Sequence, residues 1–394
     1  MRFLVLSLIL GGCSSDAIPP STVDLGFDAC VSCVDAGDNA ETGSDAETDL
    51  PNDDEDIRYA GFVPLFRFDP YLVGHGFRIV DGVNSRVQLV VAGGTSGFTL
   101  EKVLSSELEN STSLEHLTSI PWREGFILTG TSAGVAEFDG ELKLTSNLEV
   151  YPGTKSLHRF RNQAVVFGGE RIGFVESTLL GLSVSKELSL DSADYLNDYA
   201  KSFAFGRQVV HEGILYDIAA VENRKTLVGA WDLNASDSES AYLGASETAD
   251  VHNTRWSASP ENQRIFVSSD STEIAVFTMS SPPTLEQMWD VEHLMLDPTG
   301  SFSHTISGDW LILTFRVPGR DDRAYYVLDA SATELTCLGK IADGEFNLNG
   351  QDQVEFTGIG DEVFVSYGES DIIDNVVNLR SMRRSDFQLV DCDQ

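Results

Sequence analysis

Five of the seven histidines occupy similar places in the chain, each a short distance before a run of apolar residues. They are His75, His116, His158, His252 and His304. Neutral imidazole is a good metal ligand, so five such rings near one rim could bind a transition metal ion. A side chain that recurs with a repeat is instead typical of a structural role, because a metal site usually breaks repeat symmetry. We therefore favour the structural interpretation and predict no metal site.

One short motif has the spelling of a nucleophile site. Residues 130–134 read Gly-Thr-Ser-Ala-Gly, the G-x-S-x-G pattern that α/β-hydrolases place between a strand and a helix. The residues that follow, Val135–Phe138, are predicted to form a strand, so a tight hairpin with glycine at the turn explains the motif. Walker-type phosphate loops and a G-x-G-x-x-G after a strand are absent from the sequence. We predict no catalytic residue, no cofactor and no enzyme activity.

Two further groups of side chains could bind ligands. The cluster of Arg380, Arg383 and Arg384 is a rare positive spot, and we expect it to pair with neighbouring acids rather than with an anionic partner. The tryptophans could stack on sugars from loops, but we expect them to pack inside the fold. They are Trp122, Trp231, Trp256, Trp289 and Trp310.

The composition restricts the partners of the protein. The 394 residues include 62 acidic and 26 basic side chains, and the formal net charge is −36. A chain this acidic repels nucleic acids and anionic membrane surfaces, so we exclude nucleic-acid binding. No apolar run reaches the ~18 residues of a membrane-spanning helix.

The first residues predict export. A basic start, Met1-Arg2, precedes the apolar run Phe3–Leu10, which is followed by Gly11-Gly12-Cys13. The order Leu-Gly-Gly-Cys resembles the lipobox of bacterial lipoproteins. The resemblance implies that residues 1–12 are a signal peptide, and that Cys13 is lipidated and becomes the mature N-terminus. Because Ser14 does not look like an inner-membrane retention signal, we expect a protein anchored in the cell outer membrane, facing the periplasm or the cell surface. The alternative is an ordinary secretory signal with an incidental cysteine.

Residues 13–57 differ in composition from the rest of the chain. Residues 14–57 contain 13 acidic and no basic side chains, and small residues fill most of the remainder. Like charges repel and little apolar surface is available, so we predict a lipidated, disordered acidic tether. The D-x-[DN]-x-[DN]-G spacing of a calcium loop is absent.

The remaining cysteines are even in number once Cys13 carries lipid. In an oxidising compartment we expect disulfides, and the simplest pairing is Cys30 with Cys33 and Cys337 with Cys392. The C-x-x-C of the first pair lacks the βαβ context of a redox enzyme and the additional ligands of a zinc site. The second pair closes a loop of about 55 residues, worth about 4 kcal/mol in the loop-entropy account, so we interpret it as structural.

Residues 58–394 show a repeat. Short strand-like apolar runs recur with starts about 38 to 52 residues apart, separated by Gly, Asn, Asp and Ser. The seven strongest runs are 87–91, 125–129, 164–167, 213–216, 264–267, 310–314 and 362–365. Repeats of ~40–50 residues with about four short strands each are typical of a β-propeller. We predict an all-β fold of seven four-stranded blades, because one such sheet cannot bury both of its faces alone.

A family resemblance supports the propeller. The stretch His252–Phe277 has a histidine, a Ser-Pro turn, an apolar strand and a polar turn, and is similar to a repeat of WD-type propellers. Phe126–Asp139 is similar, with Phe138-Asp139 at the Trp-Asp place, and both Trp231-Asp232 and Tyr325–Ala330 are similar to strand ends of WD-type and quinoprotein-like propellers. The resemblance implies that each repeated histidine begins an innermost strand and hydrogen-bonds a Ser, Thr or Asp of its own blade.

The sequence does not identify the strand that completes the last blade. The runs Tyr59–Phe68 and Phe387–Val390 both compete for the strand that completes the last blade. For the function we expect a binding module at the bacterial cell envelope, with a protein partner. The alternative is a lyase or hydrolase acting on envelope polysaccharide at the mouth of the propeller channel, and a third possibility is an assembly scaffold in the outer membrane.

Overall fold

The fold is taken from a computed structural model. It describes residues 57–80, 82–94, 97–104, 118–130, 134–148, 154–168, 171–189, 208–221, 225–248, 255–268, 272–294, 301–316, 323–342, 354–367 and 371–392. These ranges all belong to one compact unit, Ser44–Gln394. Within them, none of the helices has the length and apolar character needed to cross a membrane. Cys13, Cys30, Cys33, the signal peptide and the acidic tether lie outside the described residues.

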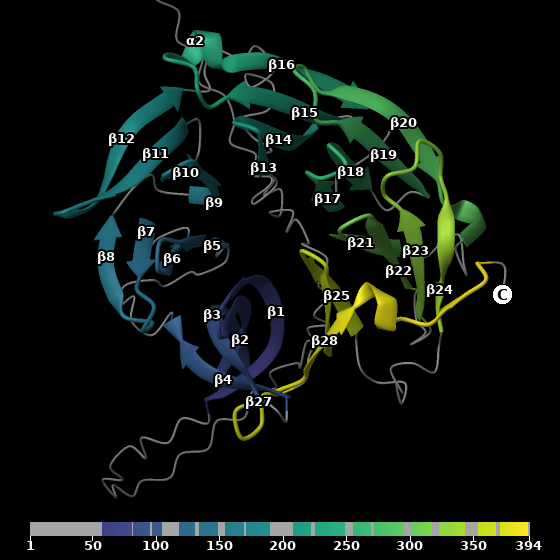
Figure 1. Cartoon of the computed structure of the whole chain (residues 1–394), viewed down its shortest axis with the longest axis horizontal. Helices are drawn as coiled ribbons and strands as arrows, with labels where there is room; N and C mark the ends of the chain where they lie inside the picture. The colour runs from purple at the N-terminus through teal and green to yellow at the C-terminus, as the bar shows by residue number, and fades with distance from the viewer. Residues whose placement is uncertain are drawn as a thin grey trace, which may run out of the picture. The chain divides into compact units, whose positions relative to one another are not determined.

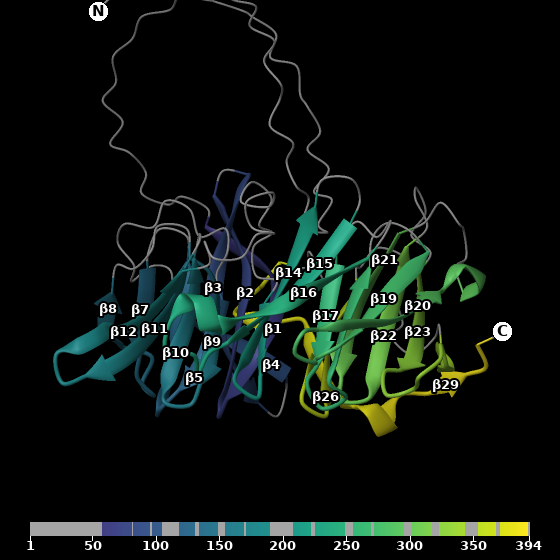
Figure 2. The same cartoon turned by 90° about the horizontal axis from the view of Figure 1, so that it is seen from above.

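Seven antiparallel sheets stand side by side around a central axis and form a β-propeller (Figures 1 and 2). Blade 1 is formed by β1 (Arg58–Phe68), β2 (Tyr71–Val80), β3 (Val83–Gly94) and β4 (Gly97–Val103). Blade 2 is formed by β5 (Thr118–Trp122), β6 (Gly125–Gly130), β7 (Gly134–Phe138) and β8 (Leu144–Leu148). Blade 3 is formed by β9 (Thr154–Phe160), β10 (Gln163–Gly168), β11 (Arg171–Thr178) and β12 (Gly181–Ser189). Blades 4 and 5 are formed by β13 (Gln208–His211), β14 (Ile214–Val221), β15 (Lys225–Asp232) and β16 (Tyr242–Thr248), and by β17 (Arg255–Ser259), β18 (Arg264–Ser268), β19 (Glu273–Thr278) and β20 (Thr284–Asp290).

Blade 6 is formed by β21 (Ser301–Ser307), β22 (Trp310–Arg316), β23 (Arg323–Asp329) and β24 (Cys337–Ile341). Blade 7 pairs β25 (Val354–Ile359), β26 (Glu362–Tyr367) and β28 (Leu379–Arg383). The described residues also include the short helices α2 (Ser238–Ala241), η2 (Glu292–Leu294) and η3 (Arg384–Asp386). The predicted seven-bladed propeller is therefore confirmed.

The second strand of each blade explains the apolar runs in the sequence. In β18, Ile265 and Val267 pack toward blade 4, whereas Phe266 packs toward blade 6. Because both faces of this strand are buried, its three central residues, Ile265–Val267, are all apolar. Six of the seven runs fall on second strands, and the exception is 87–91, which lies in β3, the third strand of blade 1.

The core is divided among the joints between blades. Each of the seven hydrophobic clusters contains residues from two neighbouring blades, and the seventh joins Phe364 and Leu379 of blade 7 to Phe62 and Leu89 of blade 1. Removing apolar surface from water is the main favourable term in folding. Each blade thus depends on both neighbours for burial, which is the physical reason for a closed ring.

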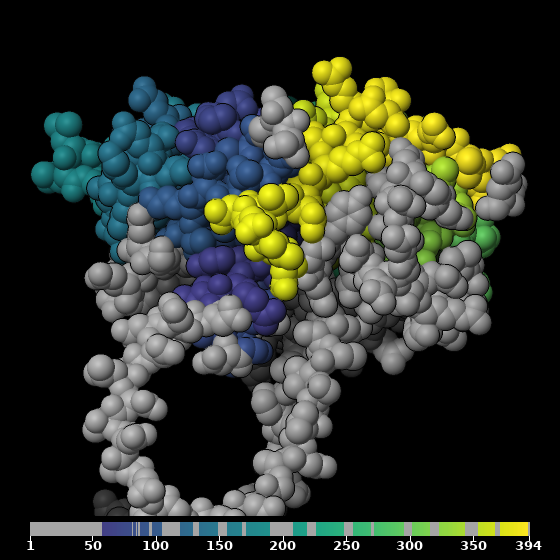
Figure 3. Space-filling view, turned by 90° about the horizontal axis from the view of Figure 1, so that it is seen from below, coloured from purple at the N-terminus to yellow at the C-terminus, as the bar shows by residue number. Residues whose placement is uncertain are grey.

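Two two-residue strands near the C-terminus leave their own blade and pair with others. β27 (Val376–Val377) adds a fifth strand to the outer edge of β4 in blade 1, and β29 (Leu389–Val390) adds one to β24 in blade 6. The amide of Ile372 also donates to the carbonyl of Tyr59, at 2.7 Å. In Figure 3 the yellow C-terminal residues accordingly lie against the purple and blue residues of blade 1.

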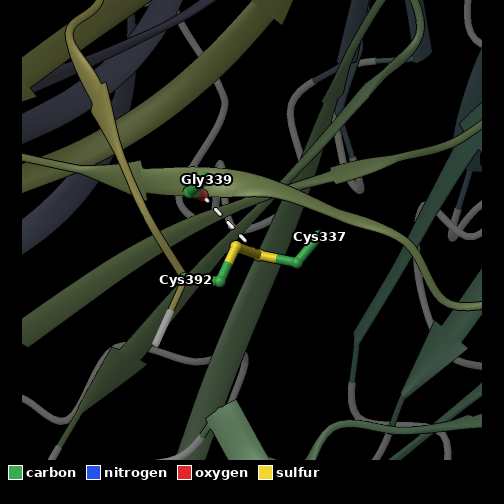
Figure 4. Close-up of a disulfide and its surroundings, with 3 residues drawn as sticks. All are labelled: Cys337, Gly339 and Cys392. Atoms are coloured by element: carbon green, nitrogen blue, oxygen red, sulfur yellow. Dashed lines mark hydrogen bonds between the residues drawn. A yellow bond between two sulfur atoms is a disulfide. The ribbon is translucent and has the colours of Figure 1, made fainter. Parts of the chain in front are cut away.

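Neither run that competed for the last edge strand takes that place. Tyr59–Phe68 is part of β1, the innermost strand of blade 1, and Leu389–Val390 pairs with blade 6. A disulfide joins Cys337, the first residue of β24, to Cys392, with Cα atoms 6.5 Å apart (Figure 4). The carbonyl oxygen of Gly339 lies 3.9 Å from the sulfur of Cys337. The bond, in the pairing expected from the sequence, holds the end of the chain to the outer edge of blade 6.

One face of the ring carries the turn between the first and second strands of every blade, together with the turn between the third and fourth strands. We call it the hairpin face, and we call the two kinds of turn first turns and third turns. The Trp-Asp place identified in the sequence begins the third turns of blades 2, 4 and 6. There, the Oδ1 atoms of Asp139, Asp232 and Asp329 accept backbone N–H groups two residues further on, at 2.8–2.9 Å.

Candidate binding site

A cavity of about 450 Å³ opens on the hairpin face, at the ends of the innermost strands β13, β17, β21 and β25. We call it the mouth pocket. It is lined by Val209, Trp256, Ser257, Ala258, Ser259, Pro260, Glu261, Thr305, Ile306, Gly308, Gly358 and Gly360. Pockets of roughly 300–1,000 Å³ are typical of small-ligand sites.

Close packing of the innermost strands shapes one wall of the mouth pocket. A Cβ atom on Gly358 would lie 1.7 Å from the carbonyl oxygen of Ile306, so only glycine permits this approach of β25 to β21. The hydroxyl of Ser259 donates to the carbonyl of Gly308 at 3.4 Å, and that of Ser307 donates to the carbonyl of Gly360 at 3.2 Å. Serines at the ends of innermost strands thus connect blades 5, 6 and 7 around the opening.

Trp256 gives the mouth pocket an aromatic wall. Its indole is partly buried against the core between blades 4 and 5, and it lines the cavity beside Ala258 and Val209. The predicted packing role holds for Trp122, Trp231 and Trp289, which are 3% exposed or less. Trp310 packs edge-on against the ring of Phe387. Among the five tryptophans, Trp256 is the one that lines this cavity.

The charge at the mouth is negative. Glu261 is exposed and is the one carboxylate in the pocket lining, which contains no Lys, Arg, His or Cys. The first turns of six blades carry an exposed acidic side chain, and we call this set the acidic ring. Its members are Asp69, Glu124, Glu212, Glu261, Asp309 and Asp361.

Arg384, one of the three clustered arginines, pairs with the acidic ring. It forms ion pairs with Asp309 and with Asp361, the latter at 2.8 Å. The predicted pairing with neighbouring acids is confirmed for this residue.

A second, smaller pocket of about 350 Å³ lies on the same face between blades 3 and 4. We call it the arginine pocket, because Arg159 and Arg161 line it together with Glu212. The guanidinium of Arg161 lies 4.9 Å from the centre of the Phe160 ring and donates to the side-chain oxygen of Asn234. Blade 3 is the blade whose first turn has no acidic residue; Arg161 lies in that turn, and Arg159 lies in β9 just before it.

The histidines do not form a metal site within the described ranges, where no three His, Cys, Asp or Glu side chains are close enough to hold an ion. His158 and His304 lie on the innermost strands β9 and β21, as predicted. His75 instead lies in β2, the second strand of blade 1, because that blade begins earlier than its apolar run suggests. His116 and His252 lie outside the described residues.

The two innermost histidines act at joints between blades. The Nδ1 atom of His304 lies 2.8 Å from the hydroxyl of Ser257 in blade 5, so the expected bond within its own blade is wrong for this residue. Burial lowers the pKa of His304 to about 3, with a further contribution from the positive charge of Arg255. Burial alone lowers the pKa of His158 to about 4. Both rings are therefore neutral at pH 7.

The G-x-S-x-G motif falls on a hairpin and not on a nucleophile elbow. β6 and β7 pair antiparallel from Gly130↔Gly134 to Phe126↔Phe138, so a strand follows the motif where a hydrolase needs a helix. Ser132 itself lies outside the described residues.

The lining of the mouth pocket supplies groups that can bind a ligand. Glycoside hydrolysis uses a pair of carboxyl groups about 5–9.5 Å apart, and Glu261 has no second carboxylate beside it in the lining. The lining supplies one aromatic face, apolar side chains, hydroxyls and one negative charge. The sequence analysis missed Glu261 and the arginine pocket, since a single charged turn residue carries no signal in so charged a chain. The recurrence of acids at first turns could have revealed the ring once the strand boundaries were known.

Comparisons with known proteins find distant structural likenesses. No family model matches the chain. No curated protein matches it either. The propeller domain of Cps50 (Swd1) from Myceliophteria thermophila is 11% identical over 81% of this chain and 96% of its own, with a TM-score of 0.49. Sqt1 from Saccharomyces cerevisiae is 12% identical over 85% of both chains, also at 0.49. AztD from Citrobacter koseri is 11% identical over 70% of this chain and 85% of its own, at 0.43. None of these likenesses carries an argument about function.

Proposed function

We propose that the protein is a lipid-anchored binding module of the bacterial cell envelope, whose propeller engages a protein partner through the hairpin face. Cys13 carries the lipid and anchors the chain in the outer membrane, and the partner lies in the periplasm or at the cell surface. The mouth pocket is the observation that carries the docking part of this proposal. The sequence Leu10-Gly11-Gly12-Cys13 carries the anchoring part.

The hairpin face suits docking because it is held rigidly. The pocket lining comes from four blades, and hydrogen bonds from Ser259 and Ser307 fix neighbouring blades around it. A preorganised surface loses little conformational entropy on association, so more of the contact energy appears as affinity. The concave, partly apolar pocket then offers a place for one buried anchor side chain at the centre of an interface.

Photo-crosslinking in living cells tests the docking face. A photoreactive amino acid replaces Pro260, exposed in the lining of the mouth pocket, in one strain and Asn147, exposed on the outer strand β8, in a matched control strain. We expect a discrete crosslinked partner with the probe at position 260 and none at position 147. Equal crosslinking at both positions, or crosslinking at 147 alone, contradicts the assignment of the hairpin face.

Membrane fractionation tests the anchor separately. The Cys13→Ala variant should be exported and should then be found in the soluble periplasmic or extracellular fraction, because it has no site for the lipid. Cys30→Ala is the matched control and should stay with the membranes. An exported Cys13→Ala protein that remains membrane-bound as completely as the wild type would show that the lipid is not the anchor.

A further inference from the structure

Because Glu261 and Trp256 line one cavity, we infer that the mouth pocket receives a basic side chain, lysine or arginine, from the protein partner. The inference rests on the proposed function and specifies the chemistry of recognition. The occupant has a cationic head and an apolar stem, and both find complementary groups in the lining.

The apolar part of the lining matches the stem. Val209, Ala258 and Ile306 come from three different innermost strands and line one cavity. The methylene groups of lysine and arginine bury readily along such surfaces while the charged head stays near water. The pocket is open at the hairpin face, so a side chain can enter from a docked partner.

The charged end has two partners in the lining. A guanidinium or ammonium group is attracted to the face of an indole, and tryptophan is the strongest of the aromatic side chains in this interaction. The exposed carboxylate of Glu261 offers a charge-assisted hydrogen bond at the same opening. The lining itself contains no Lys or Arg. The cation nearest to it that the structure describes is Arg384, whose guanidinium packs against Gly308 and is paired with Asp309 and Asp361.

The charge of the whole molecule favours the same class of partner. Residues 58–394 carry 49 acidic and 25 basic side chains. The acidic ring adds to this charge on the hairpin face. Arginines offset it at three of the six members, Arg384 at Asp309 and Asp361 and Arg67 at Asp69. A negative field around a concave site raises the rate at which cationic partners arrive.

The test uses the purified, full mature chain and two peptides. One peptide has a single arginine between glycines and serines, and the other has citrulline, its neutral isostere, at the same place. Affinities are measured by isothermal titration for the wild type, for Glu261→Gln, and for the matched control Glu124→Gln, which removes an acidic-ring charge outside the pocket. Both substitutions are at exposed turn positions and should leave the fold intact.

We expect Glu261→Gln to weaken binding of the arginine peptide by at least about fivefold and Glu124→Gln by less than about twofold. The citrulline peptide should bind the wild type at least about fivefold more weakly than the arginine peptide does. A Trp256→Phe variant, which keeps an aromatic ring, should show an intermediate loss.

Two results would overturn the inference. Equal losses in Glu261→Gln and Glu124→Gln would mean diffuse attraction without a pocket, and equal binding of the two peptides would mean that the occupant is not cationic. If a partner crosslinks at position 260 in cells while the peptides bind alike, the inference fails and the proposed function stands. If no partner crosslinks there, the proposed function itself fails.

Discussion

Two joints, one between blades 3 and 4 and one between blades 5 and 6, are each bridged by a cation of the earlier blade. The cation is a lysine in the first joint and an arginine in the second. In the first, Lys186 of blade 3 donates to the carbonyls of Leu233 (at 3.2 Å) and Ala235 in the third turn of blade 4. In the second, Arg264 of blade 5 donates to the carbonyls of Ala330 (at 3.0 Å) and Ala332 in the third turn of blade 6. Each joint thus has a cation that donates hydrogen bonds to the carbonyls of the next blade's turn. We call Lys186 and Arg264, with the carbonyls that they bind, the lysine clamp and the arginine clamp.

The same two joints each enclose a neutral histidine and end in a pocket. His158 stands on the innermost strand at the first joint and His304 at the second. The arginine pocket lies at the first joint, and the mouth pocket includes residues of the second. The linings of the two pockets differ in charge. The two joints thus share an imidazole on the innermost strand and a pocket, whereas the cation comes from the fourth strand, β12, in one joint and from the second strand, β18, in the other. Individual side chains decide what each pocket prefers to bind.

The clamps differ in how completely the cation is paired. Arg264 is 8% exposed and holds Glu286 through two bonds, Nε to Oε2 at 3.1 Å and Nη2 to Oε1 at 2.9 Å. Lys186 forms no such bond with a carboxylate in the described part of the chain, and its ammonium lies 4.5 Å from the centre of the Phe174 ring. Desolvation lowers the pKa of Lys186, against the opposing effect of Asp232 and Asp237.

Substitution of the arginine clamp should have the largest effect on stability. Arg264→Met leaves Glu286 without its partner and two carbonyls without donors, and we expect a loss of about 3–5 kcal/mol in the free energy of unfolding. Lys186→Met should cost about 1–3 kcal/mol, since no carboxylate is left behind. Urea unfolding gives both values.

The control for the clamps is a surface ion pair. Arg171 and Glu187 are paired at 3.4 Å with both side chains about half exposed. Arg171→Met should cost only about 0–1 kcal/mol. If Arg264→Met costs no more than this control, the clamp does not stabilise the joint.

Loss of the disulfide should have the next largest effect on the free energy of unfolding. It should affect blade 6 and leave the joint between blades 3 and 4 unchanged. Cys337→Ser combined with Cys392→Ser frees a loop with a sequence separation of 55, and the loop-entropy account predicts a loss of about 4 kcal/mol at most. Hydrogen exchange should accelerate in β24 and β29 of blade 6 and remain slow in β9 and β13. The same bond predicts that neither Cys337 nor Cys392 is labelled by thiol reagents in the denatured, unreduced protein, and persistent labelling would contradict it.

Acid should weaken both joints by a smaller amount. Each buried imidazole has a pKa below its ordinary 6.5 in the folded state, so the unfolded state binds more protons as the pH falls below 6.5. Stability is therefore complete above pH 6.5 and declines toward about pH 4 for His158 and about pH 3 for His304. At pH 5 each histidine should cost about 2 kcal/mol relative to pH 7.

Single variants test the titration. His158→Gln and His304→Gln should each remove about 2 kcal/mol from the difference in unfolding free energy between pH 7 and pH 5. His293→Gln, at an exposed position in η2, is the matched control and should leave the difference unchanged. A His158 or His304 variant that keeps the whole wild-type difference would show that its imidazole is not neutral and buried in the folded protein.

Much of the fold could be predicted because a strand buried on both faces has an unbroken apolar sequence. Blade 1 shifted by one strand in the prediction because β2 is interrupted by Gly74, His75 and Gly76. Those glycines are required, since a Cβ on Gly74 would lie 2.3 Å from the carbonyl oxygen of Val63. A steric requirement between two strands is invisible to a pattern read along one of them.

The features that were missed depend on contacts between repeats. The bond between His304 and Ser257 joins two neighbouring blades, so predicting it requires the alignment of one blade against the next. The two-residue strands β27 and β29 are too short for any periodic signal, and their pairing partners are set by the closed ring. Glu261 is recognised as part of a site only from the pocket lining, to which four blades contribute.

A crystal structure of the protein with the arginine peptide tests the binding account most directly. The account predicts a guanidinium group in the mouth pocket, between the indole of Trp256 and the carboxylate of Glu261, and no peptide in the arginine pocket. Peptide density at another surface with an empty mouth pocket would contradict it.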